Sequence, residues 1–363
     1  MTPLNIADRI SDYANAIRYS ARHEESFDYT TQAWRIWKAR FKYGIGARLY
    51  SLFDLRYVDE RNWSDYIIDE PFKLVQRAAS SLEARLVADN KLAFFNHCER
   101  HKIPTIPVVG LMSHTPDIQK YGVPFIGSPD ALASLFELHG QSLFFKLIDG
   151  SHGRNAFVAR RTGDAYKIEE AQLTLTEFFD YCQAQIEEES GWLIQPVAAN
   201  HADMLDYMAS GLGTVRVVTF LEEGEPQVMC ACLRITCGSG VADNFSHGRS
   251  GNLVAAVHLD TGRLGNARGS TRLDWPVMKS YSNHPSRGVS IAGREVPYWQ
   301  ETLELVKQAH KSLVLLKIVG WDVGITDHGP ILVEANSTSD VDLLQVACQR
   351  GFRPWFNERH FRV

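Results

Sequence analysis

The sequence of 363 residues predicts a protein of the α+β class. Residues 1–88 carry apolar side chains at helical spacing, whereas the chain after residue 197 is rich in segments that alternate between apolar and polar residues. Near the C-terminus, residues 321–336 have the pattern of two strands joined by a tight turn. A helical beginning followed by a strand-rich remainder places the chain in this class.

Composition limits the classes of function. The 38 basic and 43 acidic residues make the chain mildly acidic, so no global positive charge favours a nucleic-acid partner. Residues 1–5 lack the features of a signal peptide, and the most apolar stretch, residues 312–320, is short and contains Lys317, so no membrane span is expected. Six cysteines without zinc-like spacing indicate reduced thiols in a cytoplasmic protein, and a homo-oligomer is left open.

The N-terminal helical segment, residues 1–88, contains a stripe of aromatic residues. Trp34, Trp37 and Phe41 stand at helical spacing with basic residues between them. Such a helix either packs its aromatic side chains on the protein body or presents them to a membrane surface or a polyanion. We favour packing on the body, which leaves the lysines of this helix solvated.

Three further regions follow, at residues 89–114, 115–197 and 198–363. In the first two we expect a helix at 91–101 and a strand at 108–111, then strands at 142–148, 155–160 and 192–196 with a helix near 175–188. In the third we expect strands at 214–220, 227–236 and 253–259, a helix within 297–319, and the final hairpin. The second region forms a small lobe and the third a larger one.

The final hairpin determines which side chains share a face. A three-residue loop at 327–329 pairs Thr326 with Pro330. That register sets Asp322 opposite Glu334. The intervening apolar residues form the other face, which we expect to pack against the core.

Asp322, Glu334 and Asn336 are the predicted metal ligands. The hairpin register places their two carboxylates and one amide oxygen on one face. Mg²⁺ prefers such oxygen donors together with the phosphates of a substrate. The alternative is that any half-exposed hairpin shows polar residues at alternate positions.

A lysine and a glycine-rich turn indicate a phosphate site. Lys146 interrupts an apolar strand, and the turn after it contains Gly150, Ser151, Gly153 and Arg154. The glycines let backbone N–H groups approach an anion, and a lysine inside an apolar strand needs an anionic partner. The lysine precedes the glycines and a strand follows them, so this is not a Walker A loop. An ordinary glycine hairpin is the alternative.

Two other patterns contribute. Gln195, Pro196 and Val197 end an apolar strand, and because Pro196 stops regular pairing, neighbouring backbone groups can bind the edge of an adenine. Arg216 and Arg234 lie inside apolar strands and need carboxylate or phosphate partners. Internal ion pairs and contact with a ligand are both compatible with these arginines.

Taken in order along the chain, these residues resemble the ATP-grasp superfamily. The narrower likeness is to the sugar-transfer-associated ATP-grasp proteins of polysaccharide gene clusters, and it covers roughly residues 40–350. It rests on Lys91 with residues 103–105, Gln195 with His201, residues 214–219, Asp243-Asn244, His284-Pro285 and Gly320-Trp321-Asp322.

The resemblance implies an ATP-grasp fold, in which two α+β lobes hold ATP between them and an N-terminal helical segment precedes them. It implies two Mg²⁺ ions at Asp322, Glu334 and Asn336. The residues implied to bind ATP are Lys91, Lys146, Gly150, Ser151, Gly153, Arg154, Gln195, Pro196, Val197 and His201. The implied catalytic residues are Arg216, Arg234 and Asn244.

The resemblance further implies an ATP- and Mg²⁺-dependent carboxylate–amine ligase. The metal and the lysines neutralise charge on the γ-phosphoryl group, the carboxylate becomes an acyl phosphate, and the amine displaces phosphate. An amino acid or amine and a sugar acid form the candidate substrate pair, in polysaccharide or secondary metabolism. His247 and Arg249 stand where relatives commonly carry a glycine pair, which favours a more anionic acceptor.

Two alternatives stay open. The first is an ATP-grasp phosphotransferase that acts on a hydroxyl group. The second is a non-catalytic, nucleotide-binding accessory of a glycosyltransferase system, with the helix of Trp34 and Trp37 as its docking surface.

Overall fold

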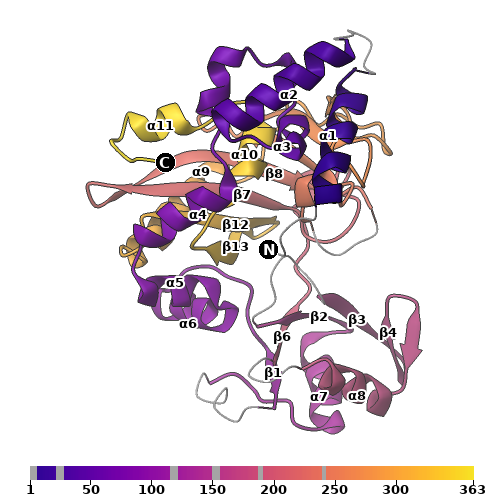
Figure 1. The fold of residues 1–363 in the computed structure, drawn as a ribbon. Helices are drawn as coiled ribbons and strands as arrows, with labels where there is room; N and C mark the ends of the chain where they lie inside the picture. The colour runs from indigo at the N-terminus through magenta and orange to yellow at the C-terminus, as the bar shows by residue number, and fades with distance from the viewer. Residues whose placement is uncertain (1–5, 22–27, 115–121, 149–155, 187–190, 239–242) are drawn as a thin grey trace.

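The computed structural model describes residues 6–21, 28–114, 122–148, 156–186, 191–238 and 243–363, and it contains a larger and a smaller lobe (Figure 1). Helices and antiparallel sheets are both present, so the predicted α+β class is confirmed. The described residues include no helix of the length and apolarity that a membrane crossing needs. The helices are α1 Ile6–Ala21, α2 Tyr29–Tyr43, α3 Ala47–Leu52, η1 Leu55–Tyr57, η2 Glu60–Asp65, α4 Asp69–Ala78, α5 Leu82–Asp89, α6 Lys91–His101, α7 Pro129–His139, α8 Leu175–Ala184, η4 Ala202–Met204, η5 Ser246–Gly248, α9 Trp299–Ser312, α10 Val341–Cys348 and α11 Arg353–Asn357.

The smaller lobe contains a six-stranded sheet in the order β1-β6-β2-β3-β4-β5, and each neighbouring pair is antiparallel. Phe145 and Trp192 face α7 and α8 and pack with Phe136 and Phe178 in one apolar cluster. Because side chains alternate along a strand, the residues on either side of Phe145 point to the other face of this sheet. The strands are β1 Gly110–Ser113, β2 Ser142–Leu147, β3 Phe157–Thr162, β4 Ala165–Ile168, β5 Ala171–Leu173 and β6 Gly191–Pro196.

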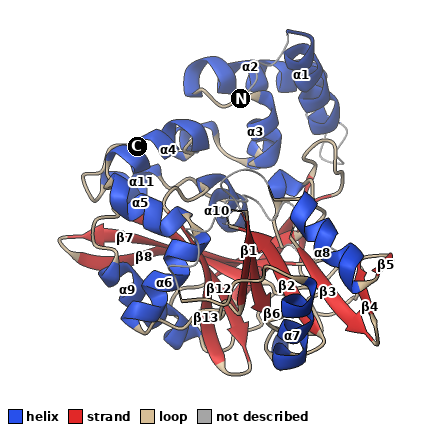
Figure 2. Cartoon of the chain, turned by 90° about the horizontal axis from the view of Figure 1, so that it is seen from below, coloured by secondary structure: helices blue, strands red, loops and turns tan. Residues whose placement is uncertain are grey.

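The larger lobe contains a seven-stranded antiparallel sheet in the order β11-β10-β9-β8-β7-β12-β13. One face, which includes Val217 and Trp321, packs against α5, α6 and α9 (Figure 2). The other face carries Val218 and Phe220 and packs against α10 and the N-terminal helices. The strands are β7 Thr214–Glu222, β8 Glu225–Ile235, β9 Leu253–Val257, β10 Leu264–Ser270, β11 Met278–Tyr281, β12 Ile318–Thr326 and β13 Gly329–Asn336.

The N-terminal helices share a core with the larger lobe. Ile36, Tyr50 and Trp63 are buried in the same cluster as Val218 and Phe220. The backbone N–H of Ile67 also donates to Oε1 of Gln345 at 2.8 Å, and Nε2 of Gln345 donates to the carbonyl oxygen of Ile67 at 2.9 Å. The N-terminal segment is therefore part of the larger lobe's packing and not an appendage.

The prediction that the aromatic stripe packs on the body is wrong. Trp34, Trp37 and Phe41 are 54%, 54% and 70% exposed. The buried face of α2 is formed instead by Gln32, Ile36 and Ala39, which are spaced by four and three residues and so lie together on the opposite side of the helix. The small side chain of Ala39 allows close packing against the neighbouring helices. The bulky rings consequently point to solvent.

The β12–β13 hairpin reaches the predicted pairing by a different route. Thr326 pairs with Gly329 and not with Pro330, so the turn has two residues rather than three. A bulge beside Asp322 then inserts one extra residue on β13 and restores the pairing of Asp322 with Glu334. The predicted loop is wrong, whereas the predicted partner of Asp322 is confirmed.

Candidate functional site

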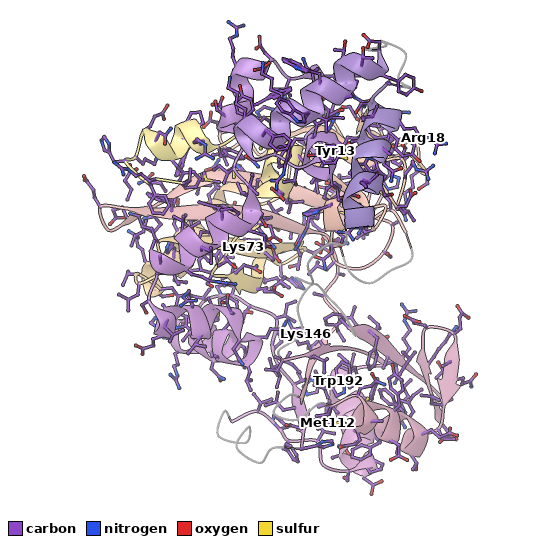
Figure 3. All side chains as sticks on the ribbon, in the orientation of Figure 1. Tyr13, Arg18, Lys73, Met112, Lys146 and Trp192 are labelled. Atoms are coloured by element: carbon purple, nitrogen blue, oxygen red, sulfur yellow. The ribbon has the colours of Figure 1, made fainter. Side chains whose placement is uncertain are left out.

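Lys146 is a buried cation on the face of the small sheet that lies opposite the α7–α8 core. Its residue is 8% exposed, and its ammonium makes no hydrogen bond or ion pair with any residue that the structure describes. Burial lowers the pKa of Lys146 to about 8; Glu334 opposes this effect, Lys91 adds to it, and Asp322 opposes it more weakly. Figure 3 shows Lys146 on the side of the smaller lobe that is turned to the larger lobe. The carboxylates of Glu334 and Asp322 on the β12–β13 hairpin lie near enough to act on its charge.

Glu334 and Asn336 form the other side of the site. They lie two residues apart on β13 and so share the face of Asp322. The carboxylate of Glu334 makes no hydrogen bond or ion pair within the described parts of the chain. Asn336 donates its Nδ2 to the carbonyl oxygen of Gly320 at 3.3 Å, which leaves its Oδ1 without a described partner. Within the part of the chain that the structure describes, the carboxylate of Glu334 and Oδ1 of Asn336 are thus without partners on this face.

Asp322 belongs to a buried ionic network on the same face. Arg216 donates its Nε to Oδ1 of Asp322 at 2.5 Å and its Nη2 to Oδ2 at 3.1 Å. Arg234 places its Nη2 2.8 Å from Oδ2 of Asp322 and its Nε 3.1 Å from Oδ2 of Asp243. Burial by itself would raise the pKa of Asp322, but the two arginines outweigh it and the pKa falls. Two guanidinium groups thus neutralise two carboxylates.

In this network Asp322 keeps little capacity for a metal ion, and its role as a metal ligand stays a prediction. Its Oδ2 accepts hydrogen bonds from two guanidinium groups and its Oδ1 from one, so a single lone pair of Oδ1 is left. Among the described residues, no group of three or more histidine, cysteine, aspartate or glutamate side chains is arranged to hold a metal ion. The unpaired oxygens of Glu334 and Asn336 nevertheless fit Mg²⁺, which needs few protein ligands when phosphates complete its shell.

Lys91, the first residue of α6, is held between the two sheets. Its Nζ donates to the carbonyl oxygen of Ile148, just beyond the end of β2, at 3.3 Å. Asp89 accepts the backbone N–H of Ser337 at 2.9 Å, directly after Asn336 at the end of β13. The α5–α6 junction therefore places Lys91 close to the end of β2, which carries Lys146, and close to the end of β13, which carries Asn336.

The side chain of Gln195 is buried and binds the protein's own backbone. Its side chain is 4% exposed and donates its Nε2 to the carbonyl oxygen of Ile106 at 2.9 Å, while its Oε1 is buried without a partner in the described structure. Pro196 pairs with Leu143 at the end of β6, and Val197 is 45% exposed where the chain leaves the small sheet. The adenine-binding role of this backbone stays a prediction.

His201 and Asn244 have contacts near their own loops, and their predicted roles in the site stay predictions. His201 donates its backbone N–H to Ile325 at 2.8 Å, and its Nδ1 accepts the N–H of Asp203 at 3.1 Å, which caps η4 beside the hairpin turn. The carbonyl oxygen of Asn244 accepts Nδ2 of Asn252 at 3.0 Å within its loop. The predicted phosphate turn of Gly150, Ser151, Gly153 and Arg154 lies outside the described residues.

The sequence analysis missed a second ionic cluster beside the first. Nζ of Lys73 in α4 lies 2.8 Å from a carboxylate oxygen of Asp69 and 2.8 Å from one of Asp340 (Figure 3). Burial opposes the ionisation of Asp340, but Lys73 and, more weakly, Arg216 lower its pKa to about 2. The spacing of Asp69 and Lys73, four residues apart on one helix, was the available indication.

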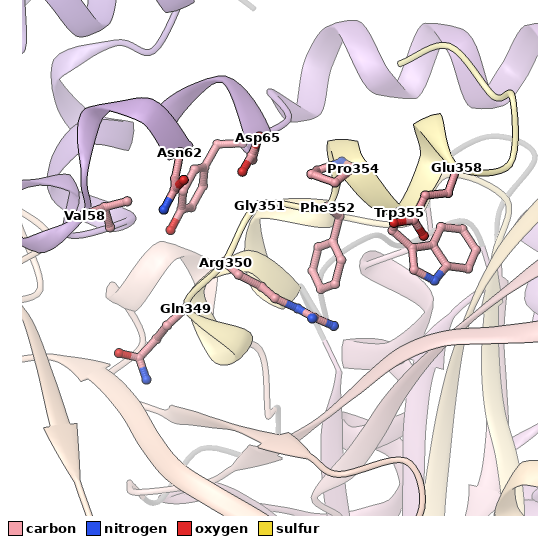
Figure 4. Close-up of a pocket in the computed structure, with 11 residues that line it drawn as sticks. Val58, Asn62, Asp65, Gln349, Arg350, Gly351, Phe352, Pro354, Trp355 and Glu358 are labelled. Carbon is pink, nitrogen blue, oxygen red and sulfur yellow. The ribbon is translucent and has the colours of Figure 1, made fainter.

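Two surface cavities lie away from these residues. One of about 380 Å³ lies beside η2 and α11 and is lined by residues that include Tyr66, Arg350 and Trp355 (Figure 4). Another of about 430 Å³ lies beside β10 and β11 and is lined in part by Asp54 and Arg268. Neither is lined by a predicted site residue, so the charges between the two sheets define the candidate site.

Comparisons with known proteins support one family. A family model described as sugar-transfer associated ATP-grasp matches residues 74–359. Similar solved structures include carboxyaminoimidazole ribonucleotide synthase from Aspergillus clavatus complexed with ATP, at 13% identity over 71% of this chain and 46% of that chain, with a TM-score of 0.38. They also include D-alanyl-alanine synthetase A from Vibrio cholerae, at 10% identity, 78% and 64% coverage and a TM-score of 0.42. The chain spans less than two thirds of the length of either protein, and the comparison with curated proteins gave no match.

Proposed function

We propose that this protein, which belongs to the sugar-transfer-associated ATP-grasp family, is an ATP- and Mg²⁺-dependent carboxylate–amine ligase. The observation that carries the proposal is the buried ammonium of Lys146, which has no partner among the described residues and faces the equally unpaired carboxylate of Glu334. A buried charge is costly unless it is paired. A ligand with several negative charges would pair Lys146 and Lys91 together.

A polyphosphate and a divalent cation account for both sides of the site. Phosphate oxygens can contact Lys146 directly, but they repel the carboxylate of Glu334. A cation between the phosphates and Glu334 removes this repulsion, and Mg²⁺ commonly bridges one or two protein ligands to phosphates in this way. Glu334 and Oδ1 of Asn336 would hold Mg²⁺, which would supply stabilisation of negative charge on the phosphoryl group.

The proposed reaction has two steps. An oxygen of the substrate carboxylate attacks the γ-phosphorus, the bond from phosphorus to the β–γ bridging oxygen breaks, and ADP leaves. The nitrogen of the amine then attacks the acyl carbon, the bond from that carbon to the phosphate oxygen breaks, and the amine loses a proton. The products are an amide, ADP and phosphate. Lys91 and Lys146 neutralise the phosphates in the first step.

The arginine network has a positioning role in this proposal. Arg216 and Arg234 are each 5% exposed and bind the carboxylates of Asp322 and Asp243. Because Asp322 pairs directly with Glu334 across the hairpin, the two arginines fix the strand that presents Glu334. This differs from the catalytic role that the resemblance implies for the two arginines.

The test is ADP formation with Mg²⁺ and a panel of carboxylates and amines, followed by mass measurement of the product. We expect turnover that needs both substrates, an amide product and free phosphate. E334Q and K146M should lower turnover at least about 100-fold, the scale on which phosphoryl-transfer electrostatics operate. E170Q and K167M, which change exposed residues of the smaller lobe, serve as matched controls.

Two outcomes would contradict the proposal. Unchanged turnover in E334Q would exclude its metal-binding role. A product that retains phosphate on a hydroxyl group would identify a phosphotransferase instead of a ligase.

A further inference from the structure

Helix α2 presents an aromatic face that the described parts of the protein leave exposed. Trp34, Trp37 and Phe41 are each at least half exposed, whereas Ile36 and Ala39 on the opposite side of the helix are fully buried. The rings of Trp37 and Phe41 lie 5.0 Å apart, so they form one continuous apolar surface. Packing within the larger lobe therefore does not explain why these three positions carry large aromatic side chains.

The aromatic face is bordered by positive charge. Helix α2 contains four basic residues and no acidic one, although the whole chain has a net charge of −5. Lys38 and Lys42 lie on one border of the face and Arg40 on the other. Glu60 offsets part of this charge, since it lies 2.7 Å from Nζ of Lys38 and 3.9 Å from Nζ of Lys42. Two positive charges are left beside the rings.

We propose that α2 binds the surface of a lipid bilayer that contains anionic lipids, with the helix axis in the plane of the membrane. Aromatic rings on one face and basic side chains on its borders are the features of helices that lie in the interfacial region. Tryptophan is favoured there because its ring is apolar and its N–H is polar. The basic side chains attract anionic lipid headgroups. A bilayer of neutral lipids offers no such attraction.

The shape and size of the surface favour a membrane over a protein partner. The three rings stand on the convex side of a single helix, and together they expose roughly 400 Å² of surface. A stable protein interface buries about 800 Å² on each partner. A bilayer requires no complementary groove, so a short ridge of rings with a basic border is sufficient for reversible binding.

The position of α2 leaves the site accessible. Figure 1 shows α2 at the end of the larger lobe that lies farthest from β2 and the rest of the smaller lobe. Binding through α2 would therefore hold the protein at a membrane without covering the face of β13 that carries Glu334. This inference does not depend on the proposed reaction.

The experiment is sedimentation of the full-length protein with vesicles of phosphatidylcholine alone or mixed with phosphatidylglycerol. We expect binding to the mixed vesicles, weaker binding at high salt, and at least about tenfold weaker binding by W34A/W37A/F41A, since each removed ring forfeits favourable burial. R40Q/K42Q should lose most of the preference for the anionic vesicles. L138A is the matched control, because Leu138 is 78% exposed on α7 of the smaller lobe.

The result that would overturn the inference is equal binding of the triple variant and the wild type, or equal binding to both kinds of vesicle. A wild-type dimer in sedimentation velocity that the triple variant abolishes, without any vesicle binding, would assign the aromatic face to a second copy of the chain and would also overturn it. The three substitutions change exposed side chains, so urea unfolding should match that of the wild type.

Discussion

Two groups of charged side chains on the facing sheets differ in one respect. In the larger lobe, Arg216, Arg234 and Asp322 on the sheet and Asp243 in the loop after β8 are buried and balanced, with each charge in contact with an opposite one. Lys146 in the smaller sheet is equally buried but has no opposite charge in contact among the described residues. The difference supports the proposal that Lys146 and Glu334 bind a ligand, whereas the first group maintains the fold.

The largest expected effect concerns the balanced group. Replacing Asp322 by alanine leaves two buried guanidinium groups without their shared partner, and breaking a buried pair in this way costs about 3–5 kcal/mol. We expect the free energy of unfolding of D322A in urea to fall by about this amount. D180A, on the exposed side of α8, is the control and should change little. A loss below 1 kcal/mol would mean that the network does not maintain the fold.

The second prediction concerns the unbalanced lysine. Burial lowers the pKa of Lys146 to about 8 from its ordinary value of 10.5, so below pH 8 the folded protein holds an unfavourable charge. K146M should therefore raise the free energy of unfolding without nucleotide, by up to about 3 kcal/mol at pH 7. Between pH 8 and 10.5 the unfolded wild type binds more protons than the folded one, so wild-type stability rises and the difference disappears.

A loss of stability in K146M at pH 7 would show that this ammonium already has an internal partner. The statement that Lys146, unlike the charges of the larger sheet, lacks an opposite charge would then be wrong. Measuring urea unfolding at pH 7, 8.5 and 10 separates the two results, because only the predicted one depends on pH.

The smallest expected effect is on Glu334. Its carboxylate makes no hydrogen bond or ion pair within the described structure and only partly offsets the burial of Lys146, so E334Q should lower the free energy of unfolding by no more than about 1 kcal/mol. Thermal unfolding without metal or nucleotide measures this. A loss comparable to that of D322A would instead make Glu334 part of the internal network.

The sequence predicted the elements and the family well. The helix at Lys91–His101 and the strands that begin at Ser142 and Thr214 were confirmed, as were the α+β class and the resemblance to sugar-transfer-associated ATP-grasp proteins. Lys146 could be selected because a lysine within an apolar strand is conspicuous. The short strands β4, β5 and β11 were missed, since three or four residues give too little alternation to distinguish a strand from a turn.

Long-range pairing could not be predicted. Arg216 and Asp322 are 106 residues apart, and only the adjacency of β7 and β12 brings them into contact, so the sequence could not decide between an internal partner and a ligand. The predicted pairing of Asp322 with Glu334 is present only because two departures from the predicted hairpin cancel: the turn is one residue shorter, and a bulge adds one residue on β13. The exposure of Trp37 likewise depends on which side of α2 meets its neighbouring helices.

The central claim is that Lys146 and Glu334 await a magnesium–nucleotide complex, and calorimetric titration of ADP into the full-length protein tests it most directly. We predict that Mg²⁺ strengthens binding in the wild type, that K146M weakens binding at least about tenfold, since it removes a charge-assisted contact, and that E334Q abolishes the effect of Mg²⁺. Nucleotide binding of the same affinity in all three proteins, with no dependence on Mg²⁺, would contradict the claim.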